Sequence, residues 1–139
     1  MKAPAGMPTL RSLHGPRETM DRLVDTVRAR GMTVFARIDH GAGAEAAGLL
    51  LRPTELLIFG SARAGTLLMQ VAQTIGIDLP LKALVWQDAG GTTWLGYNDP
   101  HWLASRHNVA ADRASVLHAM EEILAAIARE ATGSVGDAS

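Results

Sequence analysis

Hydrophobic residues follow a helical period in the first third of the chain. Four apolar side chains fall at positions i, i+3, i+4 and i+7, namely Met20, Leu23, Val24 and Val27. Pro16 precedes this group and Gly31 follows it, which matches the preference of proline for the first helical turn and of glycine for the position beyond the last. The pattern therefore predicts an amphipathic helix between Pro16 and Gly31.

The next segments have the pattern of strands. A short first strand is expected at Thr9–Leu13, and Thr33–His40 alternates with a period of two. This alternation places Val34, Ala36, Ile38 and His40 on one face of a sheet and Phe35, Arg37 and Asp39 on the other. Glu55–Gly60 is apolar without interruption, which predicts a central strand covered on both faces or nearly so. A carboxylate at its middle, in Ile58→Asp, is then expected to abolish folding.

A hairpin is the strongest turn signal in the sequence. Lys82–Asp88 and Thr92–Asn98 flank the tripeptide Ala89-Gly90-Gly91. Trp86 and Trp94 belong to opposite arms, so their rings are expected on the same face of the sheet. They form either part of the core or, if no helix covers that face, an exposed partner surface.

Three further helices follow from capping residues. Thr66 can cap a helix that Gly76 closes, Asp99 can cap a short helix that begins at Pro100, and Asp112 opens a long last helix. Together the elements predict an α+β domain. We expect a mixed four- to five-stranded sheet with helices mainly on one face, which is a two-layer α/β sandwich.

Composition limits the class of protein. Of the 139 residues, 47% are hydrophobic and 19% charged, which suits one folded domain over residues 1–131. The small and polar residues of 132–139 predict a flexible C-terminal tail. The net charge of −1 gives no electrostatic reason for binding to nucleic acid or to an anionic membrane. The sequence has no cysteine, no signal-peptide pattern and no apolar run of about 18 residues, so we expect a cytoplasmic protein.

The turn Gly60–Thr66 has the spacing of a phosphate loop. It lacks the lysine that such a loop needs, because Gly65 is followed directly by Thr66, so nucleotide hydrolysis is not expected. Free backbone N–H groups at the helix start, with Ser61 and Arg63 beside them, could still hold a small anion. The alternative is an ordinary strand-to-helix turn.

The histidines do not predict a metal site. His118 and Glu122 lie four apart on the last helix and supply two ligands, whereas zinc needs three or four, so they are interpreted as a solvated helix face. His40 follows Asp39 at a strand end, and neighbours in a strand point to opposite faces. We expect neither a metal nor a cofactor.

The heptapeptide GYNDPHW combines several polar and aromatic groups at the end of the hairpin. A strand stop and helix cap explain Asp99 and Pro100, but they do not explain Tyr97, Asn98 and His101. We therefore expect Asn98 or Tyr97 to line a pocket with His40 or Thr66.

Long segments of the sequence resemble the family named domain of unknown function 302, over about Arg17 to Val109. The segments are FARIDHGAGAEAAGL, RPTELLIFGSARAGTLLMQ and IGIDLPLKALVWQDAGGTTWLGYNDPHWLASRH. The resemblance implies a small α/β sandwich with a mixed sheet, and a dimer, but it implies no reaction. The motif residues that it carries over are Asp39, His40, Gly60, Gly65, Thr66, Lys82, Tyr97, Asn98, Asp99 and Pro100.

Cysteines that many family members carry are missing here. The corresponding regions read Gly60-Ser61-Ala62 and Leu79-Pro80-Leu81, so a thiol-dependent role cannot apply to this chain.

These observations leave three functions open. The first is a homodimeric binding or interaction domain for a small ligand, an anion being one candidate, with a pocket between the end of the Thr33–His40 strand, the Ser61–Thr66 turn and the Tyr97–His101 corner. The ligand-binding candidates are Asp39, His40, Ser61, Arg63, Thr66, Lys82, Tyr97, Asn98 and His101. The second is a metal-independent enzyme with His40 as acid or base, oriented by Asp99, and with Lys82 or Arg63 stabilising an anion. The third is a partner module that uses the face of Trp86 and Trp94.

Overall fold

A five-stranded sheet forms the base of the computed structural model, which describes residues 2–133. The strands lie in the spatial order β1-β5-β4-β3-β2. Their bounds are β1 Thr9–Arg11, β2 Thr33–Asp39, β3 Thr54–Gly60, β4 Leu81–Gln87 and β5 Thr93–Tyr97. The fold is therefore α+β, as predicted.

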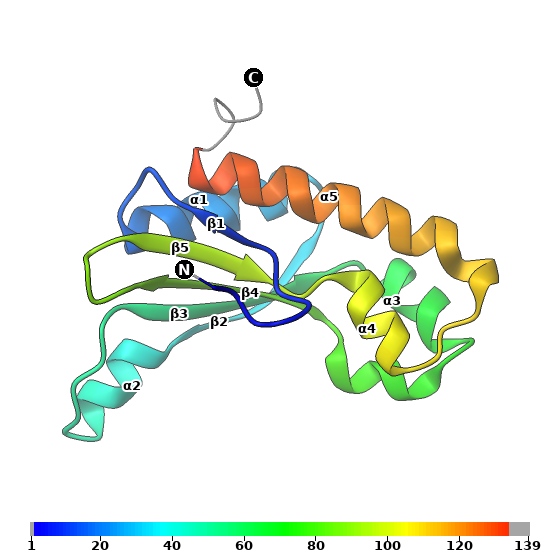
Figure 1. The fold of residues 1–139 in the computed structure, drawn as a ribbon, viewed down its shortest axis with the longest axis horizontal. Coiled ribbons are helices and arrows are strands. Elements are labelled where there is room, and N and C mark those ends of the chain that lie inside the picture. Colours follow the sequence, from blue (N-terminus) through cyan, green and yellow to red (C-terminus); the bar gives the residue numbers. More distant parts are fainter. Residues whose placement is uncertain (1, 134–139) are drawn as a thin grey trace.

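Helices cover one face of this sheet (Figure 1). The α-helices are α1 Pro16–Ala29, α2 His40–Ala46, α3 Ala62–Met69, α4 Pro100–Arg106 and α5 Ala114–Thr132, and two 3-10 helices are η1 Gln73–Asp78 and η2 Ala111–Arg113. The two long helices, α1 and α5, lie side by side over the sheet, whereas α3, η1 and α4 gather beyond one end of it. Among residues 2–133, no helix combines the length and the apolar character that crossing a membrane requires.

The hydrophobic core lies between the sheet and the α1/α5 pair. Phe59 of β3 lies there beside Leu23 of α1 and Leu124 of α5, Leu57 is also fully buried in this core, and the predicted apolar stripe of α1 faces inward. Burying a large apolar side chain stabilises a fold by about 1.5–3 kcal/mol, so each of these core residues contributes substantially to stability.

Among residues 2–133, no helix lies over the opposite face of the sheet. Trp86 and Trp94 stand directly opposite each other on β4 and β5, as the hairpin predicted, and both are only partly buried. Leu56 and Ile58 of β3 point to the same open face and are also partly buried. The prediction that β3 is covered on both faces is therefore wrong, because both long helices pack on one side. We call this surface the open face.

The sheet is antiparallel throughout the described residues, so the predicted mixed sheet is also wrong. The chain alternates β1, α1, β2, a pattern that favours neighbouring parallel strands. Here α1 instead carries the chain across the whole sheet, and three strands separate β1 from β2. The two strands run in the same direction without pairing.

A bulge interrupts β2. Val34 pairs with Phe59 and Ala36 pairs with Ile58, so Phe35 is an extra residue without a partner in β3. The uniform alternation predicted for this strand is wrong at this point. Val34 shares the helix-covered face with Phe59, whereas Ala36 shares the open face with Ile58, and Phe35 is 54% exposed.

Helix boundaries depart from the prediction in two places. Helix α3 begins after Ser61, whose hydroxyl accepts a hydrogen bond from the N–H of Ala64 at 3.3 Å, so Thr66 lies inside the helix and is not its cap. Helix α5 begins at Ala114, and Asp112 lies in η2. Asp99 is confirmed as the cap of α4, since its carboxylate accepts from the N–H of His101 at 3.0 Å.

The predicted C-terminal tail starts too early. Thr132 is fully buried inside the last turn of α5, where its hydroxyl donates to the carbonyl of Ala128 at 2.8 Å. Gly133 ends the helix with a φ of 73°, in the left-handed region that favours glycine. The remainder of the predicted tail, 134–139, lies outside the described residues.

Candidate functional site

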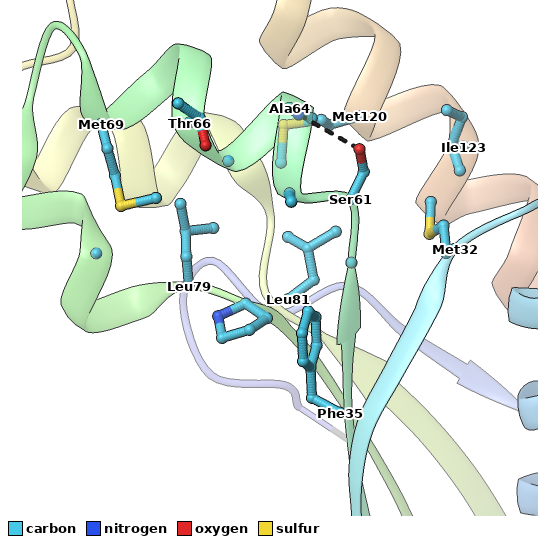
Figure 2. A pocket seen from close by; sticks show the side chains of 15 residues that line it. Met32, Phe35, Ser61, Ala64, Thr66, Met69, Leu79, Leu81, Met120 and Ile123 are labelled. Carbon is cyan, nitrogen blue, oxygen red and sulfur yellow. Dashed lines mark hydrogen bonds between the residues drawn. The ribbon is translucent and has the colours of Figure 1, made fainter.

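A pocket of about 360 Å³ opens at the end of the sheet where β3 stops and β4 starts (Figure 2). Its walls come from the start of β2, from α3, from η1 and the segment before β4, and from α5. The side chains that close it are mainly apolar, and include Met32, Phe35, Met69, Leu79, Met120 and Ile123. Three of these are methionines, whose flexible thioethers adapt to ligands of different shape.

The polar groups of the pocket lie on the turn that the sequence singled out. Ser61 and Thr66 both line it, which places the Gly60–Thr66 turn at the site. The Ser61 hydroxyl is already engaged by the N–H of Ala64, and the N–H of Gly65 donates to the carbonyl of Ser61 at 3.1 Å. Arg63 is exposed and is not among the lining residues. The turn thus contributes a polar rim to an apolar cavity.

The structure separates the predicted pocket walls. β2 runs antiparallel to β3, so Thr33, its first residue, pairs with Gly60, and Asp39, its last, pairs with Glu55. Ser61 lies six residues along the chain from Glu55, the partner of Asp39, so about 20 Å at 3.3–3.4 Å per residue separates Asp39 from the Ser61 turn. Asp39 accepts from the N–H of Ala42 and caps α2, which begins at His40. Neither residue can share a pocket with Thr66.

Lys82 lies at the same end of the sheet as the Ser61 turn, but on the open face. It pairs with Ile58, between two buried β4 residues that point toward the helices. Asp99 follows β5 at this same end, and His40 stands at the opposite end. The three residues of the predicted enzyme site do not converge.

The GYNDPHW corner packs beneath α5. Tyr97 is buried on the helix-covered face, and burial is the main cause that raises the pKa of its phenol above the ordinary value, with the negative charges of Asp99 and Glu121 adding to it. His101 is exposed, and its Nε2 lies 3.6 Å from Glu121 Oε2. Tyr97, Asn98 and His101 are not among the residues that line the Ser61 pocket.

One polar cluster has no counterpart in the sequence-based prediction. His107 Nδ1 lies 2.9 Å from the Thr74 hydroxyl, and its Nε2 lies 2.5 Å from Asp78 Oδ2. Arg106 Nη1 donates to both oxygens of Asp78 at 3.0 Å. Burial tends to raise the pKa of Asp78, but the hydrogen bond from His107 and the charge of Arg106 outweigh it and lower the pKa below its ordinary value.

This cluster could not be found from spacing, because Thr74 and His107 are 33 residues apart. The order hydroxyl, imidazole, carboxylate is that of an activated nucleophile. However, Arg106 engages both oxygens of Asp78, and the four residues join η1 to α4. A structural tether explains the arrangement.

Comparison with known proteins agrees with this fold. The family model described as domain of unknown function DUF302 matches residues 9–127. The chain belongs to this family. Its structure is similar to the crystal structure of an uncharacterized conserved DUF302 protein from Bacillus stearothermophilus, with a TM-score of 0.81 and 22% sequence identity, over 92% of this chain and 99% of that one. At this identity the likeness shows the fold.

Curated relatives have a more specific name. The chain is 46% identical over 129 residues to proteins named fluoride-specific ion channel FluC 1 in Brucella suis and in Brucella abortus. The match covers 93% of this chain, but only 51% and 48% of the two relatives. This DUF302 chain therefore spans about half the length of the relatives that carry the channel name.

Proposed function

We propose that this DUF302 domain binds a small, mainly apolar molecule in the Ser61 pocket. The observation that carries the proposal is the pocket itself, about 360 Å³ and lined mostly by apolar side chains with Ser61 and Thr66 at one side. Ligand sites typically have about 300–1,000 Å³, an apolar lining and a few polar groups that orient the ligand. A dry cavity of about 150 Å³ holds benzene, so this pocket suits a molecule about twice that size. Two-ring aromatic compounds and medium-chain fatty acids belong to this class.

Neighbouring residues of α3 offer a matched pair of variants. Ala64 lines the pocket, whereas Arg63 is exposed and does not. We expect Ala64→Leu to fill the cavity and abolish the stabilisation by an apolar ligand, and Arg63→Leu to leave it unchanged. Thermal shift with a panel of such ligands measures this, since a ligand at about 100 times its Kd adds roughly 2.7 kcal/mol. If the ligand raises the melting temperature of both variants equally, it binds outside the Ser61 pocket.

A second candidate function is anion recognition at the Ser61–Gly65 turn. The relatives named as fluoride channels favour it, together with the helix start at this turn and the nearby charge of Arg63. Sodium fluoride and sodium chloride at equal ionic strength separate the two candidates. A shift specific to fluoride that Arg63→Leu removes would support the anion function, and the apolar-ligand function predicts no such shift.

The predicted homodimer remains a proposal, and the open face supports it. Helix α2 has no buried residue and projects beyond the sheet on the side away from α1 and α5 (Figure 1). The loop after it exposes Leu49, Leu50 and Leu51, with Leu50 fully exposed. An exposed apolar loop and an apolar sheet face on one chain suit an isologous contact, in which each copy places its loop against the open face of the other.

Light scattering at micromolar concentration tests the dimer. We expect a mass of about twice the 14.7 kDa of the chain, and a shift toward the monomer in Leu50→Lys. Leu13 is exposed as well but lies near the end of α5, so Leu13→Lys is the matched control and should stay dimeric. A monomer in the unmodified protein would contradict the proposal.

The enzyme alternative finds less support than binding. His40, Asp99 and Lys82 do not converge, so a reaction that needs all three has no site of the predicted form. A cytoplasmic location remains a prediction from the sequence.

A further inference from the structure

Two histidines and a glutamate from different helices come together at the junction of α4 and α5. One ligand atom each from His101 of α4 and from His118 and Glu121 of α5 lies within 4.8 Å of the other two. The sequence offered only His118 and Glu122 and therefore predicted no metal site. The fold adds His101, which is 17 residues away from His118 in the chain.

The distances within this cluster suit a shared metal ion better than direct hydrogen bonds. His101 Nε2 lies 3.6 Å from Glu121 Oε2, and His118 Nδ1 lies 3.8 Å from Glu121 Oε1. Both separations exceed the usual hydrogen-bond range. Zn²⁺ binds nitrogen and oxygen at about 2.0–2.2 Å in tetrahedral geometry, which separates neighbouring ligand atoms by about 3.4 Å. The two imidazoles face different oxygens of Glu121, and one ligand atom from each of the three residues lies within 4.8 Å of the others, so rotations of these side chains would bring both ring nitrogens and one carboxylate oxygen to that spacing.

Glu122 completes the arrangement. Its Oε1 lies 2.7 Å from His118 Nε2, which is a hydrogen-bond distance. If Nε2 carries the proton and donates it to Glu122, Nδ1, which lies 3.8 Å from Glu121 Oε1, keeps its lone pair free for a metal. A carboxylate that orients a ligating histidine in this way is a recurrent feature of zinc sites, and it fixes the tautomer of the ring.

We propose that His101, His118 and Glu121 bind one divalent transition-metal ion, with Glu122 positioning His118. Two imidazoles and one carboxylate form a ligand set typical of zinc sites that keep a fourth position open for water. Imidazole ligands also suit Co²⁺, Ni²⁺ and Cu²⁺, and they discriminate against Mg²⁺ and Ca²⁺, which prefer oxygen. The site lies apart from the Ser61 pocket, so it neither supports nor requires the function proposed there.

Another histidine–glutamate pair provides an internal control. His14 Nδ1 lies 2.6 Å from Glu18 Oε2, four residues apart, as in the pair His118 and Glu122. Neither His14 nor Glu18 belongs to the three-residue cluster. A site that needs the α4–α5 junction should be insensitive to His14→Ala, whereas non-specific binding to histidine–glutamate pairs would be reduced by it.

Cobalt absorption on the untagged protein tests the proposal. We expect one Co²⁺ per chain at micromolar concentration, with the visible absorption of a four- or five-coordinate site, and displacement by Zn²⁺. His101→Ala and His118→Ala should lose this binding, and Glu122→Gln should weaken it by about 10- to 100-fold. Circular dichroism should show the His101, His118 and Glu122 variants folded, because these side chains are 43%, 65% and 67% exposed.

The His101→Ala variant is decisive because it leaves every α5 residue in place. If Co²⁺ binding survives this change, residues of α5 alone bind the metal, and the proposal is overturned. The absence of stoichiometric binding in the unmodified protein, or an equal loss in His14→Ala, would also overturn it.

Discussion

His107 Nε2 and Asp78 Oδ2 lie 2.5 Å apart, and this contact fastens η1 to the end of α4. Only 8% of the His107 side chain and 16% of the Asp78 side chain are exposed. The pair therefore makes its hydrogen bond largely out of water, where leaving one partner unsatisfied costs about 1–3 kcal/mol.

We expect Asp78→Asn to lower the free energy of unfolding by about 1–3 kcal/mol, because a neutral amide replaces the charged carboxylate in the hydrogen bonds with His107 and Arg106. The pKa of Asp78 is lowered in the folded protein, so its contribution is complete above the ordinary value of 3.8 and is lost as the pH falls through the folded pKa. The difference between the variant and the unmodified protein should be constant near neutral pH and should shrink below about pH 4. Urea unfolding as a function of pH measures it.

The exposed pair His14 and Glu18 is the control for this prediction. Glu18 is 61% exposed, so Glu18→Gln should change stability by less than about 1 kcal/mol at any pH. An effect of Asp78→Asn as small as that one would show that the η1–α4 contact does not stabilise the fold.

Neighbouring residues of β3 should respond in opposite ways to the same substitution. Leu57 is fully buried against the helices, so Leu57→Asp would bury an unpaired carboxylate at a cost of several kcal/mol and prevent folding. Ile58 faces the open side and is only partly buried. We expect Ile58→Asp to fold, contrary to the prediction made from the sequence, and to weaken the proposed dimer. Circular dichroism and light scattering of both variants decide between the two.

Two aspartates near helix starts should differ in their contribution to stability. Asp99 accepts from the N–H of His101, so Asp99→Ala should lower the free energy of unfolding by about 0.5–2 kcal/mol, as loss of a cap does. Asp112 lies in η2, and its side chain is 66% exposed beside Arg113. Asp112→Ala should change stability by no more than about 0.5 kcal/mol. Chemical unfolding measures both, and equal losses would contradict the assigned cap.

Tyr97 is the single tyrosine of the chain, so phenolate absorbance reports on this one side chain. Burial and the nearby acidic groups raise its pKa, so we expect a midpoint above the ordinary value of 10.0. Because the unfolded chain loses this proton first, the Tyr97 contribution to stability should decline as the pH rises above about 10. Asp99→Asn removes one of the negative charges and should move the midpoint down. A midpoint at or below the ordinary value would contradict the buried position.

Several elements of this protein follow from local sequence, although the starts of α3 and α5 and the bulge of β2 do not. The apolar stripe of α1 and its proline start, the glycine turn between β4 and β5, and the aspartate cap of α4 each depend on residues within one or two helical turns. The opposed tryptophans of the hairpin are local too, because a two-stranded register fixes which side chains stand opposite each other.

The faces and the sites were decided by the tertiary structure. Periodicity shows that β3 is apolar on both sides, but only the packing of α1 and α5 determines that Leu57 is buried and that Ile58 is left on the open face. Because β2 runs antiparallel to β3, His40 lies far from the Ser61 turn. No residue in either strand predicts whether the two strands pair in parallel or antiparallel. The pairs His107–Asp78 and His101–Glu121 join segments that are 29 and 20 residues apart. Such contacts form only when helices and strands from distant parts of the chain pack together. No local sequence pattern therefore predicts them.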